Sequence, residues 1–292
     1  MAKKPVKYYV VDAFTDSAFK GNPAAVCLLE EDKDDEWLQL VAAEFNISET
    51  CYLTPIHGTS IPRFGLRWFT PVAEVNLCGH ATLAAAHTLL SSGLVDKNAI
   101  EFVTRSGILT AKRTDVTSAL NLQNGEAPVG FYIELDFPAD PIAEFNSNDT
   151  SLISGALNGA SIIDIKRTTN GDNLLVLVTS GENVTEVQPQ FDAIVKCPGM
   201  GIIVTGIAPP ESGFDFYSRY FCPKHGINED PVCGSAHCGL APYWSKKLGK
   251  CDLKAYQASA RGGILNIHID EQKQRVFLRG KAVTVMEGSV LV

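Results

Sequence analysis

The chain has 292 residues, of which 45% are hydrophobic and 20% are charged, the composition of a globular protein long enough for two domains. Acidic residues outnumber lysine and arginine by 33 to 25, so the net charge is −8 at pH 7. A net-acidic chain without a cluster of basic residues does not attract nucleic acid or an anionic membrane, and both are excluded as partners.

No apolar leader precedes the first strand-like run, and no stretch reaches the roughly eighteen apolar residues of a membrane span. The eight cysteines are scattered along the chain, so we expect reduced thiols and a cytoplasmic protein. The nearest approach to a zinc motif is Cys233, His237 and Cys238. No second cluster completes four ligands, and we therefore predict that the protein holds no metal.

The first half alternates strand-like runs with two helices. The first helix is opened by the acidic residues 30–36 and runs to about residue 45, and the second begins after Cys78 and ends near Gly93. Strands are predicted at 8–14, 24–29, 50–54, 63–69, 100–104 and 108–113.

The second half repeats this organisation with longer insertions. Helices are predicted at 149–157, 188–195 and 233–248, and strands at 131–137, 161–167, 174–178, 201–205, 214–221, 254–257, 263–269, 276–279 and 283–286. Residues 121–128 are polar and rich in turn formers, and they are the expected linker. We therefore predict domains at 1–113 and 114–282, with the last strand, 283–292, a candidate to return to the first half.

Two octads carry the strongest pattern in the chain. Residues 229–236 (EDPVCGSA) resemble residues 74–81 (EVNLCGHA), and each octad follows a second shared run, 219–223 (RYFCP) and 67–71 (RWFTP). Two matches in the same order predict an internal duplication. Many strands and one long helix in each half favour two strand barrels, each wrapped around a helix.

Each octad is predicted to form a turn that opens a helix, with Cys78 or Cys233 at the helix N-terminus. The first amide groups there have no helical partner and the helix dipole is positive. Such a position binds a carboxylate and lowers the pKa of a thiol. The alternative is that both cysteines are small buried hydrophobes and that Gly79 and Gly234 serve close packing. The repeat, with an acid four residues before each cysteine, favours a site.

Six motifs of the chain together resemble those of a known family. Residues 10–14 (VVDAF), 21–26 (GNPAAV), 48–50 (SET), 67–71, 78–82 (CGHAT) and 229–236 are similar to those of the phenazine biosynthesis PhzF-like family. The resemblance implies an α+β fold shared with diaminopimelate epimerase, with two pseudo-symmetric domains and a site in the cleft between them. It also implies a homodimer and an isomerase that acts on a small carboxylated substrate. The sequence itself shows no nucleotide fingerprint, and we expect no cofactor.

The resemblance assigns roles to single residues. A glutamate that shuttles the proton matches Glu49, and a histidine, an aspartate and a serine that help it match His80, Asp230 and Ser235. Gly79, Gly234 and Ser235 would contact substrate at the helix starts. From the pattern alone, Glu49 also fits a solvated acid at a turn, His80 a helix-cap or core histidine, and Asp230 and Ser235 helix caps.

The chain differs from the PhzF enzyme because it has cysteine at both helix starts. Cys78 and Cys233 resemble the thiol pair of diaminopimelate epimerase, in which one thiol removes a proton and the other delivers one from the opposite face. A two-thiol amino-acid racemase or epimerase is therefore the first alternative. A non-catalytic protein that keeps the fold is the second, and the substrate is left open.

Overall fold

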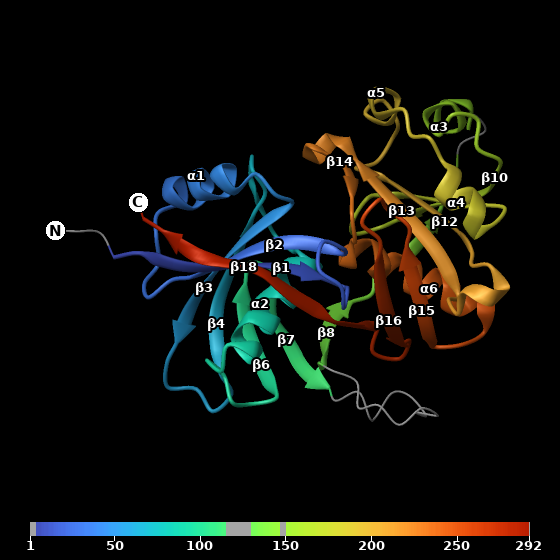
Figure 1. Ribbon diagram of the computed structural model, residues 1–292. Coiled ribbons are helices and arrows are strands. Elements are labelled where there is room, and N and C mark those ends of the chain that lie inside the picture. Colours follow the sequence, from blue (N-terminus) through green and yellow to red (C-terminus); the bar gives the residue numbers. More distant parts are fainter. Residues whose placement is uncertain (1–3, 115–129, 147–149, 292) are drawn as a thin grey trace. The chain divides into compact units, whose positions relative to one another are not determined.

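The structure, a computed structural model, describes residues 4–114, 130–146 and 150–291 (Figure 1). It divides into two compact units, Met1–Asp136 with Arg279–Val292, and Phe137–Leu278. The first unit extends beyond the boundary predicted at residue 113, because β8 (Tyr132–Pro138) pairs with β7 (Gly107–Thr114). The C-terminal strand β18 (Ala282–Val290) pairs with β1 (Val6–Ala13) in the first unit. The linker predicted at 121–128 lies outside the described residues.

The first unit is a strand barrel around one helix. Its further elements are β2 (Asn22–Leu28), α1 (Asp35–Phe45), β3 (Glu49–Ile56), β4 (Arg63–Phe69), β5 (Glu74–Val75), α2 (Gly79–Ser91) and β6 (Ala99–Thr104). The strands pair in the order β18–β1–β2–β3–β4–β6–β7–β8, with parallel pairs at β2–β3 and β4–β6. The helix α2 packs against β1, β2, β3, β7 and β18 (Figure 1).

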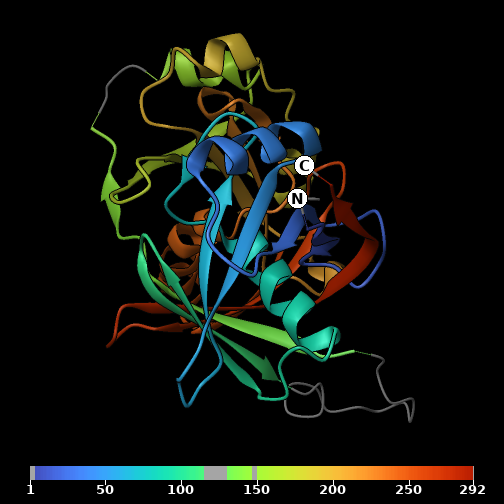
Figure 2. The same cartoon turned by 90° about the vertical axis from the view of Figure 1, so that its left-hand side faces the viewer.

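The two helices of this unit lie apart, with α1 in blue near the top of Figure 2 and α2 in teal lower down, and both contact β3. Successive side chains of a strand point to opposite sides, and Cys51 and Tyr52 show both contacts. The Cys51 thiol reaches the Ala81 carbonyl in α2, whereas the Tyr52 hydroxyl donates to the Leu38 carbonyl in α1 at 2.5 Å. The inner helix α2 is accordingly rich in alanine and buried along most of its length.

The second unit repeats this pairing scheme. Its elements are β9 (Ile142–Glu144), α3 (Ser151–Ala156), β10 (Ile162–Thr168), β11 (Leu174–Val178), α4 (Gly181–Glu186), α5 (Phe191–Ile194), β12 (Ile202–Ile207), β13 (Phe216–Cys222), β14 (Ile227–Asp230), α6 (Gly234–Leu248), β15 (Asp252–Gln257), β16 (Gly263–Asp270) and β17 (Arg275–Gly280). The strands pair in the order β9–β10–β11–β12–β13–β15–β16, with parallel pairs at β11–β12 and β13–β15. The buried helix α6 packs against β9, β15 and β16.

The structure therefore confirms the predicted fold class of two strand barrels that each surround a buried helix. The predicted helix at 149–157 is found as α3, whereas the one at 188–195 shrinks to the four residues of α5. The pattern missed α4 and the short strands β5, β9 and β14, which are too short for a periodic signal. Within the described residues, no helix is both long and apolar enough to cross a membrane.

Candidate active site

The two octads begin with the same ion pair. In the first unit, Nε and Nη2 of Arg67 donate to the two carboxylate oxygens of Glu74 at 2.8 and 2.7 Å. In the second unit, Nε and Nη2 of Arg219 bond Glu229 in the same way at 2.7 and 2.9 Å. The fork fixes each short hairpin that leads into the helix. The acid four residues before each cysteine therefore stabilises the hairpin, and whether the octads form a site stays a prediction.

Cys78 is the N-cap residue of α2 and is 8% exposed. Its sulfur lies 3.4 Å from Nδ1 of His80, and its carbonyl accepts a hydrogen bond of 2.5 Å from the Thr82 hydroxyl. The side chains two and four residues after the cysteine thus fix its sulfur and its carbonyl.

Cys233 is the N-cap residue of α6 and repeats this arrangement with different partners. Its sulfur lies 3.2 Å from the Ser235 hydroxyl and accepts from the Ala236 amide at 3.5 Å. Its carbonyl lies 2.7 Å from Nδ1 of His237, whose Nε2 lies 3.3 Å from the Ser218 hydroxyl. Because a carbonyl only accepts, Nδ1 of His237 carries the proton and Nε2 accepts from Ser218.

The helix starts retain donors for a ligand. Among the described residues, the amides of Gly79 and His80 in α2 and of Gly234 and Ser235 in α6 make no hydrogen bond within the protein. Two such amides at the positive end of a helix form a binding site for a carboxylate or another anion. Gly79 and Gly234 are buried, whereas Ser235 is exposed.

Glu49 begins β3 and is only 4% exposed, so it is not the solvated acid that its pattern alone allowed. It pairs in register with Ala24 of β2, and the preceding Ser48 hydroxyl donates to Oδ1 of Asn22 at 2.8 Å. The backbone of Pro23, in the same strand as Asn22 and Ala24, raises the pKa of the His80 ring. The first unit thus brings the Gly-Asn-Pro, Ser-Glu-Thr and Cys-Gly-His motifs to one place.

His80 is a neutral imidazole at physiological pH. Burial lowers its pKa to about 3, an effect that the Pro23 backbone only partly opposes. Its Nε2 atom is buried and makes no hydrogen bond of ordinary length among the described residues. A buried ring nitrogen normally has a hydrogen-bond partner, so Nε2 is available to a bound group.

The Cys233 thiol is protonated at neutral pH. Burial raises its pKa well above the ordinary value, and the Asp230 carboxylate raises it further, while Ser235 and the Ala236 amide act in the opposite direction. The expectation that the helix start lowers the thiol pKa is therefore wrong for Cys233, because desolvation outweighs the helix dipole. Asp230 is half-buried, and its Oδ1 accepts from the Val232 amide at 3.3 Å.

The predicted site residues form one group in each unit. Glu49, Cys78, Gly79 and His80 belong to the first, and Asp230, Cys233, Gly234 and Ser235 to the second. That both groups face one substrate stays a prediction. Sequence reasoning missed Ser218, which bonds the His237 ring, and Gln257, which bonds the second octad. Neither lies in a recognisable motif.

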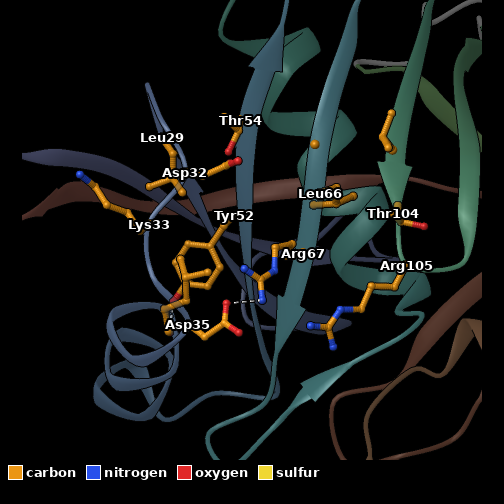
Figure 3. A pocket seen from close by; sticks show the side chains of 13 residues that line it. Leu29, Asp32, Lys33, Asp35, Tyr52, Thr54, Leu66, Arg67, Thr104 and Arg105 are labelled. Atoms are coloured by element: carbon orange, nitrogen blue, oxygen red, sulfur yellow. Dashed lines mark hydrogen bonds and ion pairs between the residues drawn. The ribbon is translucent and has the colours of Figure 1, made fainter.

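A separate cavity of about 430 Å³ lies in the first unit beside α1 (Figure 3). Its lining includes Arg67, Arg105 and Asp35, and Figure 3 shows the Asp35 carboxylate turned toward Arg67. Arg67 bonds Asp35 at 2.8 Å, and both arginines bond Glu74. These cations already have partners, and none of the predicted site residues lines the cavity, so we assign it no role in the site.

No group of three His, Cys, Asp or Glu side chains in the described part of the chain is arranged to hold a metal ion. In the nearest sequence candidate, the His237 ring bonds the Cys233 carbonyl and the Ser218 hydroxyl. The Cys238 thiol lies 3.5 Å from the Gly234 carbonyl.

Comparison with known proteins identifies the same family in sequence and in structure. The profile of the phenazine biosynthesis-like protein family matches residues 11–288. An uncharacterised isomerase from Halalkalibacterium halodurans is 45% identical over 285 residues, which cover 97% of this chain and 98% of that protein.

Solved structures agree with the sequence comparison. A PhzF-family phenazine biosynthesis protein from Enterococcus faecalis superposes with a TM-score of 0.84 at 36% identity, covering 99% of this chain and all of that one. A hydroxyproline epimerase from Agrobacterium vitis shares the fold alone, with a TM-score of 0.62 and 12% identity over 100% of this chain and 94% of that chain. The chain therefore belongs to the phenazine biosynthesis-like (PhzF) protein family.

Proposed function

We propose that this protein is a cofactor-independent isomerase that moves a proton on a small carboxylated metabolite, with Glu49 as the base. Membership of the family and relatives named as isomerases support the reaction class. The observation that carries the assignment of the base is the burial of the Glu49 carboxylate, 4% exposed, in the unit that holds His80 and the start of α2. A desolvated carboxylate is the stronger base that such a proton transfer needs.

The other site residues have complementary roles in this proposal. The amides of Gly79, Gly234 and Ser235 bind the substrate carboxylate at the helix starts. His80, neutral because its pKa is about 3, offers Nε2 as a hydrogen-bonding partner and carries no positive charge. Asp230 and Ser235 bind polar groups of the substrate. One carboxylate that removes and returns the proton on the same face gives isomerisation without inversion.

A two-thiol racemase or epimerase is the alternative, because cysteines begin both buried helices. In that reaction one thiol must be ionised and the other protonated. The raised pKa of Cys233 fits only the protonated partner and leaves Cys78 as the base. A Glu49 base needs no thiolate, and we therefore rank it first. A third candidate is a protein that keeps the fold without catalysis.

Incubation of the wild-type protein in D₂O with a panel of amino acids and cyclic carboxylates tests the reaction class. Under the proposal, deuterium enters a carbon-bound position of at least one of these compounds, as NMR or mass spectrometry would show. Folded protein that exchanges no member of a broad panel would favour the non-catalytic alternative.

The remaining assignments belong to the same proposal. We infer that the protein is cytoplasmic and forms a homodimer. We also infer that the two halves of the chain arose by an internal duplication. The repeated pairing order of the strands and the matched contacts around the two cysteines support the duplication. Sedimentation at micromolar concentration tests the dimer, and a monomer there would refute it without affecting the fold.

A further inference from the structure

Gln257 holds both ends of the second octad's turn. It is the last residue of β15 and is 1% exposed. Its Oε1 accepts from the Cys233 amide at 2.8 Å, and its Nε2 donates to the Asp230 carbonyl at 2.6 Å. One side-chain amide therefore bonds the backbone of the acid and of the cysteine that belong to the candidate site.

The two octads share a neighbouring bond. The Ser259 hydroxyl donates to the Pro231 carbonyl at 2.7 Å, and the Ser106 hydroxyl donates to the Asn76 carbonyl at the same distance. Two residues before Ser106 stands Thr104, whose hydroxyl donates to the Gly107 carbonyl. The Thr104 hydroxyl therefore bonds within its own turn, whereas Gln257 bonds the octad that contains Asp230.

The bridge lies where the spacing of two groups matters. Side chains of three elements surround the Cys233 thiol or its backbone. They are Tyr220 and Cys222 of β13, Asp230 of β14, and Ser235 and His237 of α6. The electrostatic effect of a carboxylate on a buried thiol is strong because the distance is short and the dielectric constant is low. A small change in the geometry of the turn therefore changes the pKa of the thiol. Rigid placement of such groups is what a proton-transfer site requires.

We propose that Gln257 is a positioning residue of the site, which fixes the spacing of Asp230 and Cys233 by bonding the backbone of both. The inference rests on the proposed function only in taking these two residues as part of the site. It predicts that loss of the two bonds opens the turn and exposes the thiol of Cys233, a residue that is only 6% exposed in the intact protein.

The test compares two variants of nearly equal size. Gln257→Met keeps the length of the side chain and removes both hydrogen bonds. Gln257→Glu keeps the donor and acceptor pattern of glutamine while its carboxyl group is protonated, as a buried group is at about pH 5.5. The readout is the rate at which a thiol-specific disulfide reagent modifies Cys233, divided by the rate at Cys78 in the same sample and resolved by peptide mass spectrometry.

We expect the ratio to rise at least about fivefold in Gln257→Met and to stay within about twofold of wild type in Gln257→Glu at that pH. Ser259→Ala, which removes one neighbouring bond, is the matched control and should stay within about twofold as well. Equal ratios for the Met and Glu variants, or an equal rise in Ser259→Ala, would refute the positioning role. Since no turnover is measured, either result leaves the isomerase proposal standing or falling on its own test.

Discussion

The buried His237 should make the stability of this protein fall on mild acidification. The ring is 0% exposed and donates from Nδ1 to the Cys233 carbonyl, and burial lowers its pKa to about 4 in the folded protein. In the unfolded chain its pKa is about 6.5. The folded state therefore binds fewer protons than the unfolded state between these values, and acid favours unfolding. Linkage gives a loss of about 2 kcal/mol from this one residue between about pH 7.5 and pH 5.

Urea unfolding of wild type and His237→Gln at the two pH values measures this term. The variant cannot take up a proton at residue 237, so the difference between its two unfolding free energies should be smaller than the wild-type difference by about 2 kcal/mol. Ser218→Ala is the matched control, because it removes the partner of Nε2 but keeps the ring. It should be less stable at both pH values and keep most of the pH dependence. An unchanged pH dependence in His237→Gln would refute the reasoning.

Two further predictions concern the backbone and the ion pairs. Gly21 has φ +65°, and a Cβ atom there would lie 2.2 Å from the Ala13 carbonyl oxygen, so Gly21→Ala should cost at least about 2 kcal/mol. Gly58→Ala, at φ +80° in open space, should cost only about 1 kcal/mol, and equal losses in urea unfolding would contradict this account. Arg219→Lys loses the fork with Glu229. The Arg219 and Glu229 side chains are 12% and 21% exposed, and the substitution should lower the free energy of unfolding by about 1–2 kcal/mol. An unchanged unfolding midpoint would show that the fork does not stabilise the hairpin.

The fold followed from the sequence because its signals are local or repeated. Good helix formers after Cys78 predict a helix, and the many strands around it predict that the helix is enclosed, as it is. The octads predicted that both cysteines stand at helix starts, and both are N-cap residues. The compact unit extends past the boundary predicted near residue 113, because β7 pairs with β8 across it. The local sequence of a strand does not identify the strand with which it pairs.

The details of the site followed less well, because they depend on single contacts between distant segments. Gln257 lies 24 residues after the Cys233 amide that it binds, and its own surroundings in the sequence are those of any strand end. The acids Glu74 and Glu229 favour a site in the sequence pattern, and the structure adds that each forms a fork with an arginine of the preceding strand. Only the side-chain geometry separates an acid that braces a hairpin from an acid that serves a ligand.

The central claim is that Glu49 moves the proton. The most direct test is the rate of deuterium incorporation from D₂O into a substrate found by the panel, measured for Glu49→Gln and for the double variant Cys78→Ala/Cys233→Ala, with thermal unfolding as the check on folding. Removal of the base should slow exchange by at least about 100-fold in Glu49→Gln, whereas the double cysteine variant should stay within about tenfold of wild type. Exchange that persists in Glu49→Gln and is abolished in the double variant would contradict the account and assign the proton transfer to the thiols.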